Sequence, residues 1–296
     1  MLIAAMTLYG TIGVFRHYIP LPSGLIACAR GLIGALSLVV FLLILKKKPD
    51  WAVIRSNLVP LCLSGGALGA NWVLLFEAYS RTTVASATLA YYFAPILLLI
   101  VAPFVLKERL TVRKVLCIFV ALCGVVFISG VIGGGTTELS GIAFALGAAL
   151  LYPVIVFLSK KLTEVNAFDK TVVQLLAAAA VTLPYTLLAE KWSFSEFTLA
   201  AAILLLIVCV VHTGVAYALY FGALRTMNAQ TLAILSYIDP LVAVLLSALV
   251  LKEPFGWKEA VGAVLILGAA LVSELPERRK SDVSTSGGRA SPDDLR

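Results

Sequence analysis

Two charged side chains, Arg30 and Asp239, lie deep inside long apolar runs of this chain. A charge at the centre of a lipid bilayer costs about 2.5–3.5 kcal/mol on insertion scales, so a charge in such a run usually serves an ion, a proton or a charged ligand. We predict that one or both face a central cavity and handle a charged group of a substrate or a proton. The structural alternatives are that Arg30 bonds neighbouring carbonyl groups and that Asp239 caps the helical turn freed by Pro240.

Three further polar side chains share these apolar surroundings: His212, Asn71 and Gln174. His212 is predicted either to brace neighbouring helices by hydrogen bonds or to sense protons, because histidine titrates near neutral pH. Asn71 and Gln174 offer neutral amides, and Gln174 stands in the second half of the chain roughly where Arg30 stands in the first. We count all three among the predicted cavity residues.

Aromatic side chains recur in both halves of the chain. A tyrosine ring offers apolar area together with a hydroxyl group, which suits an organic solute of mixed polarity, whereas the alternative is ordinary helix packing. Each member of the best pair stands three residues before a proline, and Pro95 and Pro240 are predicted to kink or hinge their helices. The aromatic residues predicted to line the cavity are Tyr9, Trp72, Tyr91, Tyr92, Tyr152, Tyr217 and Tyr237, of which Tyr92 and Tyr237 form that pair.

The residues that enzymes and metal sites need are missing from the sequence. The two histidines are far apart, and no HExxH motif, paired aspartates or Ser/Lys dyad occurs at membrane depth. The five cysteines are odd in number, match no zinc spacing and lie in apolar runs, and no Walker motif is present. We therefore predict no enzymatic activity, no cofactor and no metal.

Composition indicates that these residues lie in a membrane. The hydrophobic fraction is 61% and the charged fraction is 13%, whereas soluble domains have roughly 45–50% and about 25%. The net charge of +7 lies in short loops and at the C-terminal end, which fits anionic lipid headgroups and argues against nucleic acid. With about 20 apolar residues needed for each span, the predicted spans are Leu2–Phe15, Gly24–Leu45, Leu58–Tyr79, Thr83–Leu106, Val112–Ser129, Gly141–Leu162, Thr171–Leu188, Leu199–Leu224, Thr231–Leu251 and Ala260–Ser273.

An internal repeat divides these ten spans into two halves. Residues 89–108 read LAYYFAPILLLIVAPFVLKE and residues 234–253 read ILSYIDPLVAVLLSALVLKE, so an offset of 145 residues matches both the tyrosine and the proline. Five spans per half make the second half enter the membrane in the opposite sense, as in secondary transporters that bind substrate near the midplane. We predict repeats over residues 1–130 and 140–275, followed by a disordered cytoplasmic tail over residues 276–296.

Lysine and arginine are unevenly divided between the two predicted faces. With the N-terminus inside, the inner loops and the tail carry 17 basic residues and the outer loops carry 5. The positive-inside rule then predicts a multi-pass protein of the cell inner (plasma) membrane with both termini in the cytoplasm. Gly65 and Gly69 form a GxxxG pattern that predicts close helix packing, with dimerisation as the alternative, so the protein is expected to be a monomer or a homodimer.

The repeated pattern Tyr-x-x-Pro followed by Leu-Lys-Glu resembles the drug/metabolite transporter superfamily, specifically its EamA-type members, and is similar to bacterial aromatic amino acid exporters. Leu8-Tyr9-Gly10-Thr11 and Ala29-Arg30-Gly31 resemble the motifs of the first and second helices of that family. The resemblance covers about residues 1–275. It implies an all-α integral membrane protein with ten transmembrane helices as two inverted five-helix repeats, and a cavity lined by helices 1, 3, 4, 6, 8 and 9. Asp239 departs from the glutamate or apolar residue more usual there.

These patterns together predict a secondary transporter that moves a small organic metabolite by alternating access, with outward movement of amino acids, including aromatic ones, ranked first. The expected partners are the small-molecule substrate, the lipid bilayer, and either a proton or an exchanged co-substrate. The alternatives are an exporter of cationic drug-like compounds or polyamines, and a non-transporting membrane sensor or assembly protein.

Overall fold

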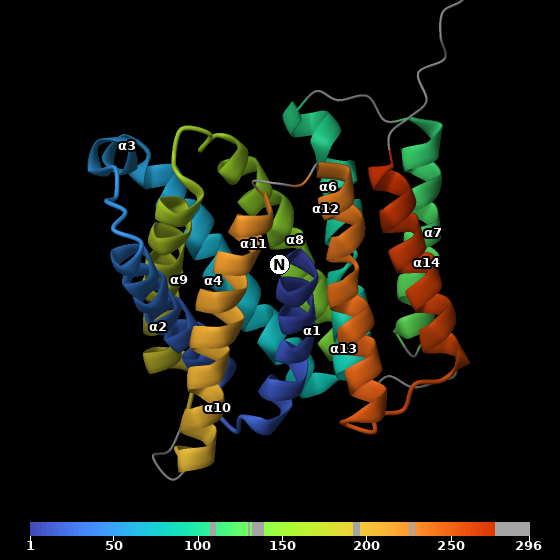
Figure 1. The fold of residues 1–296 in the computed structure, drawn as a ribbon. Coiled ribbons are helices and arrows are strands. Elements are labelled where there is room, and N and C mark those ends of the chain that lie inside the picture. The colour runs from blue at the N-terminus through green and yellow to red at the C-terminus, as the bar shows by residue number, and fades with distance from the viewer. Residues whose placement is uncertain are drawn as a thin grey trace, which may run out of the picture.

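The computed structural model describes residues 1–106, 111–129, 131, 139–191, 196–224, 227 and 229–275, and within these residues every regular element is a helix (Figure 1). The predicted tail over 276–296 lies outside the described residues, as do Lys107 and Glu108 of the first Leu-Lys-Glu motif. The first half of the chain forms α1 (Leu2–Tyr18), α2 (Ser23–Ile44), α3 (Trp51–Ser56), α4 (Leu58–Arg81), α5 (Val84–Tyr91), α6 (Ala94–Leu106) and α7 (Val112–Ile128). The second half forms α8 (Leu139–Lys160), α9 (Ala167–Ala189), α10 (Leu199–Cys209), the π-helix η2 (Val210–Val215), α11 (Ala216–Leu224), α12 (Ala229–Ser236), α13 (Ile238–Leu249) and α14 (Trp257–Glu274).

Six helical segments of the described chain are long and apolar enough to cross a membrane. Their outward surfaces carry large apolar side chains such as Phe104 and Leu188, which are 80% and 87% exposed. Water does not cover apolar surface of this extent in a soluble protein, so these faces fit lipid. The six segments are Ser23–Ile44, Leu58–Arg81, Val84–Val105, Leu139–Lys160, Ala167–Ala189 and Leu199–Ala223.

The two segments of the internal repeat are each broken at the matched tyrosine. Tyr92 separates α5 from α6 with φ −70° and ψ 3°, and Tyr237 separates α12 from α13 with φ −74° and ψ −4°. Pro95 and Pro240 follow each break by three residues. Proline lacks an N–H and its ring crowds the carbonyl group four residues earlier, which favours a break at these places, although α6, α8 and α9 continue through Pro103, Pro153 and Pro184. The predicted single spans over 83–106 and 231–251 are therefore each two shorter helices, and both tyrosines stand at the breaks.

Helices from the two halves pack in matched pairs. α1 packs against α13 and α11, while its counterpart α8 packs against α6 and α4. α2 packs against α9, and α7 packs against α14 along one edge of the molecule (Figure 1). Each of these contacts joins a helix of the first half of the chain to a helix of the second half.

The GxxxG pattern is used inside the chain, where α4 meets α9. A Cβ atom on Gly65 would collide with the carbonyl oxygen of Gln174, and one on Gly69 would lie 2.8 Å from the carbonyl oxygen of Ala178. Small residues let two helix backbones approach this closely in a membrane. The close packing predicted for this pattern is thus found between α4 and α9.

This close approach predicts opposite effects for two glycine substitutions. Gly65→Ala should lower the stability of the detergent-solubilised protein by about 1–3 kcal/mol, because overpacking forces the helices apart. Gly268→Ala is the matched control: a Cβ there meets no atom within 4 Å, so the helix-propensity gain of roughly 0.5–1 kcal/mol should raise stability. Apparent melting temperatures of the two purified variants would show the difference in sign. A rise for both would mean that α4 and α9 are not in close contact.

Candidate functional site

A cavity of about 1030 Å³ lies between the two halves of the chain. Its lining draws on both broken segments and on helices from each half. Arg30 from α2, Gln174 from α9 and Glu274 from α14 add to the helices that the family resemblance implies. The predicted residues that line it are Tyr9, Arg30, Asn71, Trp72, Tyr91, Tyr92, Tyr152, Gln174, Tyr217, Tyr237, Asp239 and Pro95.

The cavity reaches one end of the molecule. Its lining includes Ser159 at the end of α8, Lys170 at the start of α9 and Glu274 at the end of α14. In Figure 1 the α8–α9 connection and the end of α14 lie at the top, which we call the mouth end. The α1–α2 and α13–α14 connections lie at the bottom, which we call the closed end.

Arg30 is held in the cavity wall by a hydrogen bond and a ring. Its Nε donates to Thr213 Oγ1 at 2.9 Å, and its Cζ lies 4.1 Å from the centroid of the Trp72 ring, a cation–π contact. The residue is only 6% exposed. Among the described residues Thr213 is the one hydrogen-bond partner of the guanidinium group, so both terminal nitrogens remain available to a ligand.

Asp239 stands in the first turn of α13, directly after the break at Tyr237. Tyr92 Oη donates to Asp239 Oδ2 at 2.7 Å, so the tyrosine at one break holds the carboxyl group beside the other break. Asp239 and Arg30 form no ion pair, because their charged atoms are more than 4.0 Å apart. Two opposite charges therefore share one cavity without neutralising each other.

Aromatic rings fill much of the wall between these charges. The rings of Tyr92 and Tyr237 lie 6.2 Å apart between centroids, and those of Tyr9 and Tyr217 lie 5.9 Å apart at an interplanar angle of 61°. The hydroxyl group of Tyr9 is buried and makes no hydrogen bond to a described residue. A ligand with an aromatic or mixed surface would find aromatic ring faces here.

The two predicted amides line the wall but donate to the protein itself. Asn71 Nδ2 donates to the carbonyl oxygen of Ala148 at 2.6 Å, which ties α4 to α8. Gln174 Nε2 donates to Ser64 Oγ at 2.6 Å, which ties α9 to α4. In this structure both amides join helices around the cavity.

His212 lies outside the cavity that it was predicted to line. It is 1% exposed, its Nε2 lies 2.7 Å from Thr11 Oγ1, and its ring centroid lies 4.7 Å from that of Phe15. The cause is the π-helix η2, whose wider turns direct His212 towards α1 and the next residue, Thr213, towards Arg30. π-helical turns are often found at functional sites. Pro240 is also absent from the lining: it is buried in α13.

Comparison with known proteins agrees with this architecture. The model of the EamA-like transporter family matches residues 1–130 and 139–274. The uncharacterized transporter YxxF of Bacillus subtilis (strain 168) is 27% identical over 97% of this chain and 92% of its own length. The uncharacterized transporter YvbV of the same organism is 26% identical over 83% of this chain and 80% of its own length.

A solved crystal structure shares the fold, with a TM-score of 0.64, 20% sequence identity, and coverage of 91% of this chain and 93% of the other. The family model covers both halves of the chain and ends where α14 ends. A cavity between two halves, built by helices that face lipid, is the arrangement expected of a transporter and not of an enzyme. The chain belongs to the EamA-like transporter family.

Proposed function

We propose that this membrane transporter has ten spans in two inverted five-helix repeats and exports amino acids, aromatic ones among them, by alternating access. Ten spans result when α1, α7, α14 and the broken α12–α13 segment are added to the six long segments. The matched breaks at Tyr92 and Tyr237 and the exchanged pairs α1–α13 and α6–α8 support the repeat. An inverted repeat allows the two halves to exchange roles on the two faces of the membrane.

The observation that carries the substrate proposal is the separated pair of Arg30 and Asp239. An amino acid has a carboxylate and an ammonium group on one carbon atom, so it can offer each charge a partner of opposite sign. The guanidinium group has two free terminal nitrogens, which match a carboxylate in fork geometry. The carboxyl group of Asp239 would receive the ammonium group, and the tyrosine rings would surround the side chain.

The helix breaks support the same assignment. α6 and α13 both begin at the centre of the protein, so their positive N-terminal ends lie near the cavity. Pro95 and Pro240 leave the carbonyl groups of Tyr91 and Ser236 without their usual helical donor. Transporters use such helix starts for anionic groups of the substrate and such carbonyl groups for cations.

Cationic drug-like compounds and polyamines form the second candidate class. Asp239 and the tyrosine rings favour them, because cations bind carboxylates and the faces of aromatic rings. Arg30 argues against them, because a buried guanidinium group in the same cavity repels a ligand that carries only positive charge.

Orientation follows from the basic residues together with the mouth. The α8–α9 connection, which carries Lys160, Lys161 and Lys170, and the end of α14 lie at the mouth end, so this is the face predicted to hold the larger number of lysine and arginine residues. With that face in the cytoplasm of the cell inner membrane, the cavity is open to cytoplasmic substrate. Loading from this side is what export requires, driven by a proton gradient or by exchange.

Thermal stability of the purified protein in detergent tests the substrate class. A ligand of the folded state stabilises by about 2.7 kcal/mol at 100 times its dissociation constant. Phenylalanine is expected to raise the melting temperature, whereas phenethylamine, which lacks the carboxylate, and 3-phenylpropionate, which lacks the ammonium group, should each raise it less. A shift with phenethylamine or spermidine but none with any amino acid would favour the cationic class. Flux of the stabilising compound in proteoliposomes then separates a transporter from a sensor.

A further inference from the structure

The second Leu-Lys-Glu motif ends in a carboxylate that reaches from one half of the protein to the other. Lys252 has a φ of 55°, a left-handed turn, and the Glu253 N–H donates to the carbonyl oxygen of Ser247 at 3.1 Å. This turn brings Glu253 Oε2 to the hydroxyl group of Ser247 and to the backbone N–H of Val84, which donates to it at 2.8 Å. Val84 and Ser247 are both 0% exposed. The partly buried carboxylate is thus held by two contacts at the start of α5.

That contact completes the N-terminal cap of α5. The first N–H groups of a helix have no partner within it, and a side-chain acceptor usually satisfies them. Thr83 Oγ1 accepts from the Ser86 N–H at 3.1 Å, and Glu253 accepts from Val84. A carboxylate at this position is also favoured by the helix dipole. One cap donor of the first half is therefore satisfied by the second half.

The helices that Glu253 joins separate the cavity from the closed end. α5 runs from the closed end to the break at Tyr92, and α13 runs from the break at Tyr237 back to the closed end. α5 packs against α13. On the mouth side the equivalent helices are α6 and α12, and within the described residues these two do not pack together to a similar extent. The α5–α13 contact is thus present on one side of the cavity and lacks its counterpart on the other.

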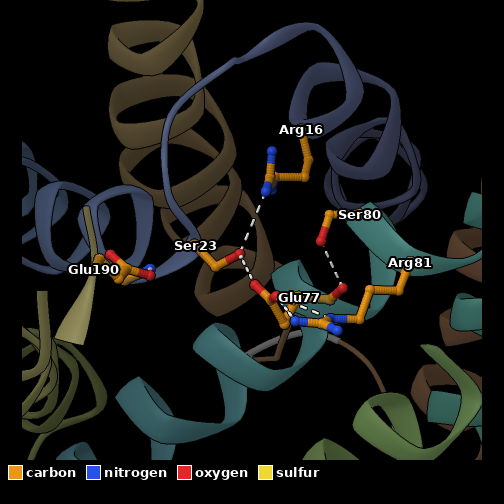
Figure 2. Close-up of polar contacts among 7 residues, drawn as sticks. Arg16, Ser23, Glu77, Ser80, Arg81 and Glu190 are labelled. Atoms are coloured by element: carbon orange, nitrogen blue, oxygen red, sulfur yellow. Dashed lines mark hydrogen bonds and ion pairs between the residues drawn. The ribbon is translucent and has the colours of Figure 1, made fainter. Parts of the chain in front are cut away.

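A second carboxylate cap at the closed end provides a contrast. Glu190, just after α9, accepts from the Gly24 N–H at 2.7 Å and from the Leu25 N–H at 3.1 Å. Partial burial raises the pKa of the Glu190 carboxyl group above its ordinary value, although the two N–H donors oppose this. Figure 2 shows Glu190 beside Ser23, which is linked to Arg16 and Glu77.

The helices joined by Glu190 meet along their whole length. Within the first two turns of α2 the Cys28 thiol donates to the carbonyl oxygen of Ala179 at 3.7 Å, and nearer the middle a Cβ on Gly31 would lie 2.7 Å from the carbonyl oxygen of Leu175. Towards the mouth end the rings of Phe41 and Phe168 lie 6.0 Å apart. α2 and α9 therefore stay in contact on both sides of the cavity, as a pivot would, and Glu190 is one contact among many.

We propose that Glu253 is a gate residue, whose bond to the start of α5 holds the closed end shut and must break before the cavity opens there. The proposal rests on the alternating access of the proposed function. It assigns a role to the Lys-Glu pair of the second repeat that does not involve substrate contact. It also predicts that Glu190, although chemically similar and on the same face, is not a gate.

Access of a thiol reagent to the cavity from each face tests the gate. Ile12 is the last residue of α1 that lines the cavity before Gly13 meets Val84, so Ile12→Cys places a reporter just inside the closed end. A membrane-impermeant maleimide is added to intact cells or to inverted vesicles, without substrate, and labelling is measured against the same chain without the reporter. With Glu253 unchanged, the reporter cysteine is expected to be labelled rapidly from the mouth end and slowly from the closed end.

Glu253→Gln should raise the labelling rate from the closed end roughly tenfold, because a hydrogen bond to a charged group is worth about 1.5–3 kcal/mol. Ser247→Ala, which removes only the hydroxyl group that orients Glu253, should give a smaller rise. Glu190→Gln is the matched control at the pivot. Glu259→Gln is the control at the same face within one half, because Glu259 accepts from the Gly256 N–H at the start of its own helix, at 2.8 Å. Neither control should change the rate.

Equal labelling of Glu253→Gln and the parent, or an equal rise in Glu190→Gln or Glu259→Gln, would overturn the assignment. Mouth-end labelling and abundance in the membrane show whether each variant is folded. If Glu253→Gln does not fold, the labelling rate of Ser247→Ala tests the gate instead. Because the readout needs no substrate, it remains valid even if the proposed amino acid is wrong.

Discussion

Arg30→Met is expected to lower amino acid transport by more than about 100-fold. The substrate carboxylate would then be buried without its guanidinium partner, and loss of one partner from a buried charged pair costs about 3–5 kcal/mol. The guanidinium group packs against Trp72 and its Nε donates to Thr213 Oγ1, whereas the other described cation of the lining, Lys170, lies at the mouth end. The measurement is flux in proteoliposomes, together with the melting-temperature rise caused by phenylalanine. Both should disappear, while the melting temperature without ligand should not fall.

Two further substitutions define what Arg30 contributes. Arg30→Lys keeps the charge but loses the planar fork, and should retain an intermediate activity. Arg81→Met removes an arginine whose side chain is 44% exposed and paired with Glu77, and should change flux less than about threefold, because exposed ion pairs contribute little. Normal transport by Arg30→Met would leave Arg30 with a structural role.

Asp239→Asn is expected to abolish the response of transport to a pH gradient. It should also weaken substrate binding by about 100-fold, as Arg30→Met should. The amide has the same shape and can still accept from Tyr92, so packing is preserved while the ionisable group is lost. The measurement is uptake into proteoliposomes with and without an imposed pH gradient. Exchange of labelled for unlabelled substrate, which moves no net proton, shows whether binding or coupling was lost.

Tyr92→Phe is the matched control for Asp239. It removes the hydrogen bond at 2.7 Å but leaves the carboxyl group in place. A hydrogen bond to a charged group contributes about 1.5–3 kcal/mol, so flux should fall by roughly 10- to 100-fold, but the response to pH should remain because the ionisable group is still present. Unchanged uptake and unchanged pH dependence in Asp239→Asn would remove Asp239 from any coupling role.

Most of the side chains predicted from the sequence to line a cavity do line it, because their signals are local. A charge in an apolar run and a tyrosine three residues before a proline are visible in the letters alone, and Arg30, Tyr92, Tyr237 and Asp239 all line the cavity. The repeat also indicated that Tyr92, Tyr237 and Asp239 would lie close together near the centre of the protein. Whether they bind a substrate stays a prediction.

The positions that could not be predicted depend on contacts between distant segments or on subtle backbone changes. The π-helix at Val210–Val215 has no composition signal, so the position of His212 outside the cavity lining and the hydrogen bond between Thr213 and Arg30 were not foreseen. The contact of His212 with Thr11 of α1 fits the alternative in which His212 braces neighbouring helices. The bond from Val84 to Glu253 joins residues 169 positions apart. The Leu-Lys-Glu motif marked Glu253 as repeated, but only the fold shows which helix it reaches.

The mouth at one end makes the two faces of the protein unequal towards an inhibitor. A compound that fits between the rings of Tyr92 and Tyr237, but is too bulky to be enclosed, would compete with substrate when it is supplied on the mouth face. On the opposite face the same compound would find no site while α5 and α13 stay together. The difference in inhibition between the two faces therefore measures the relative populations of the two conformations, one open at the mouth end and one open at the closed end, without any need to observe a transported molecule.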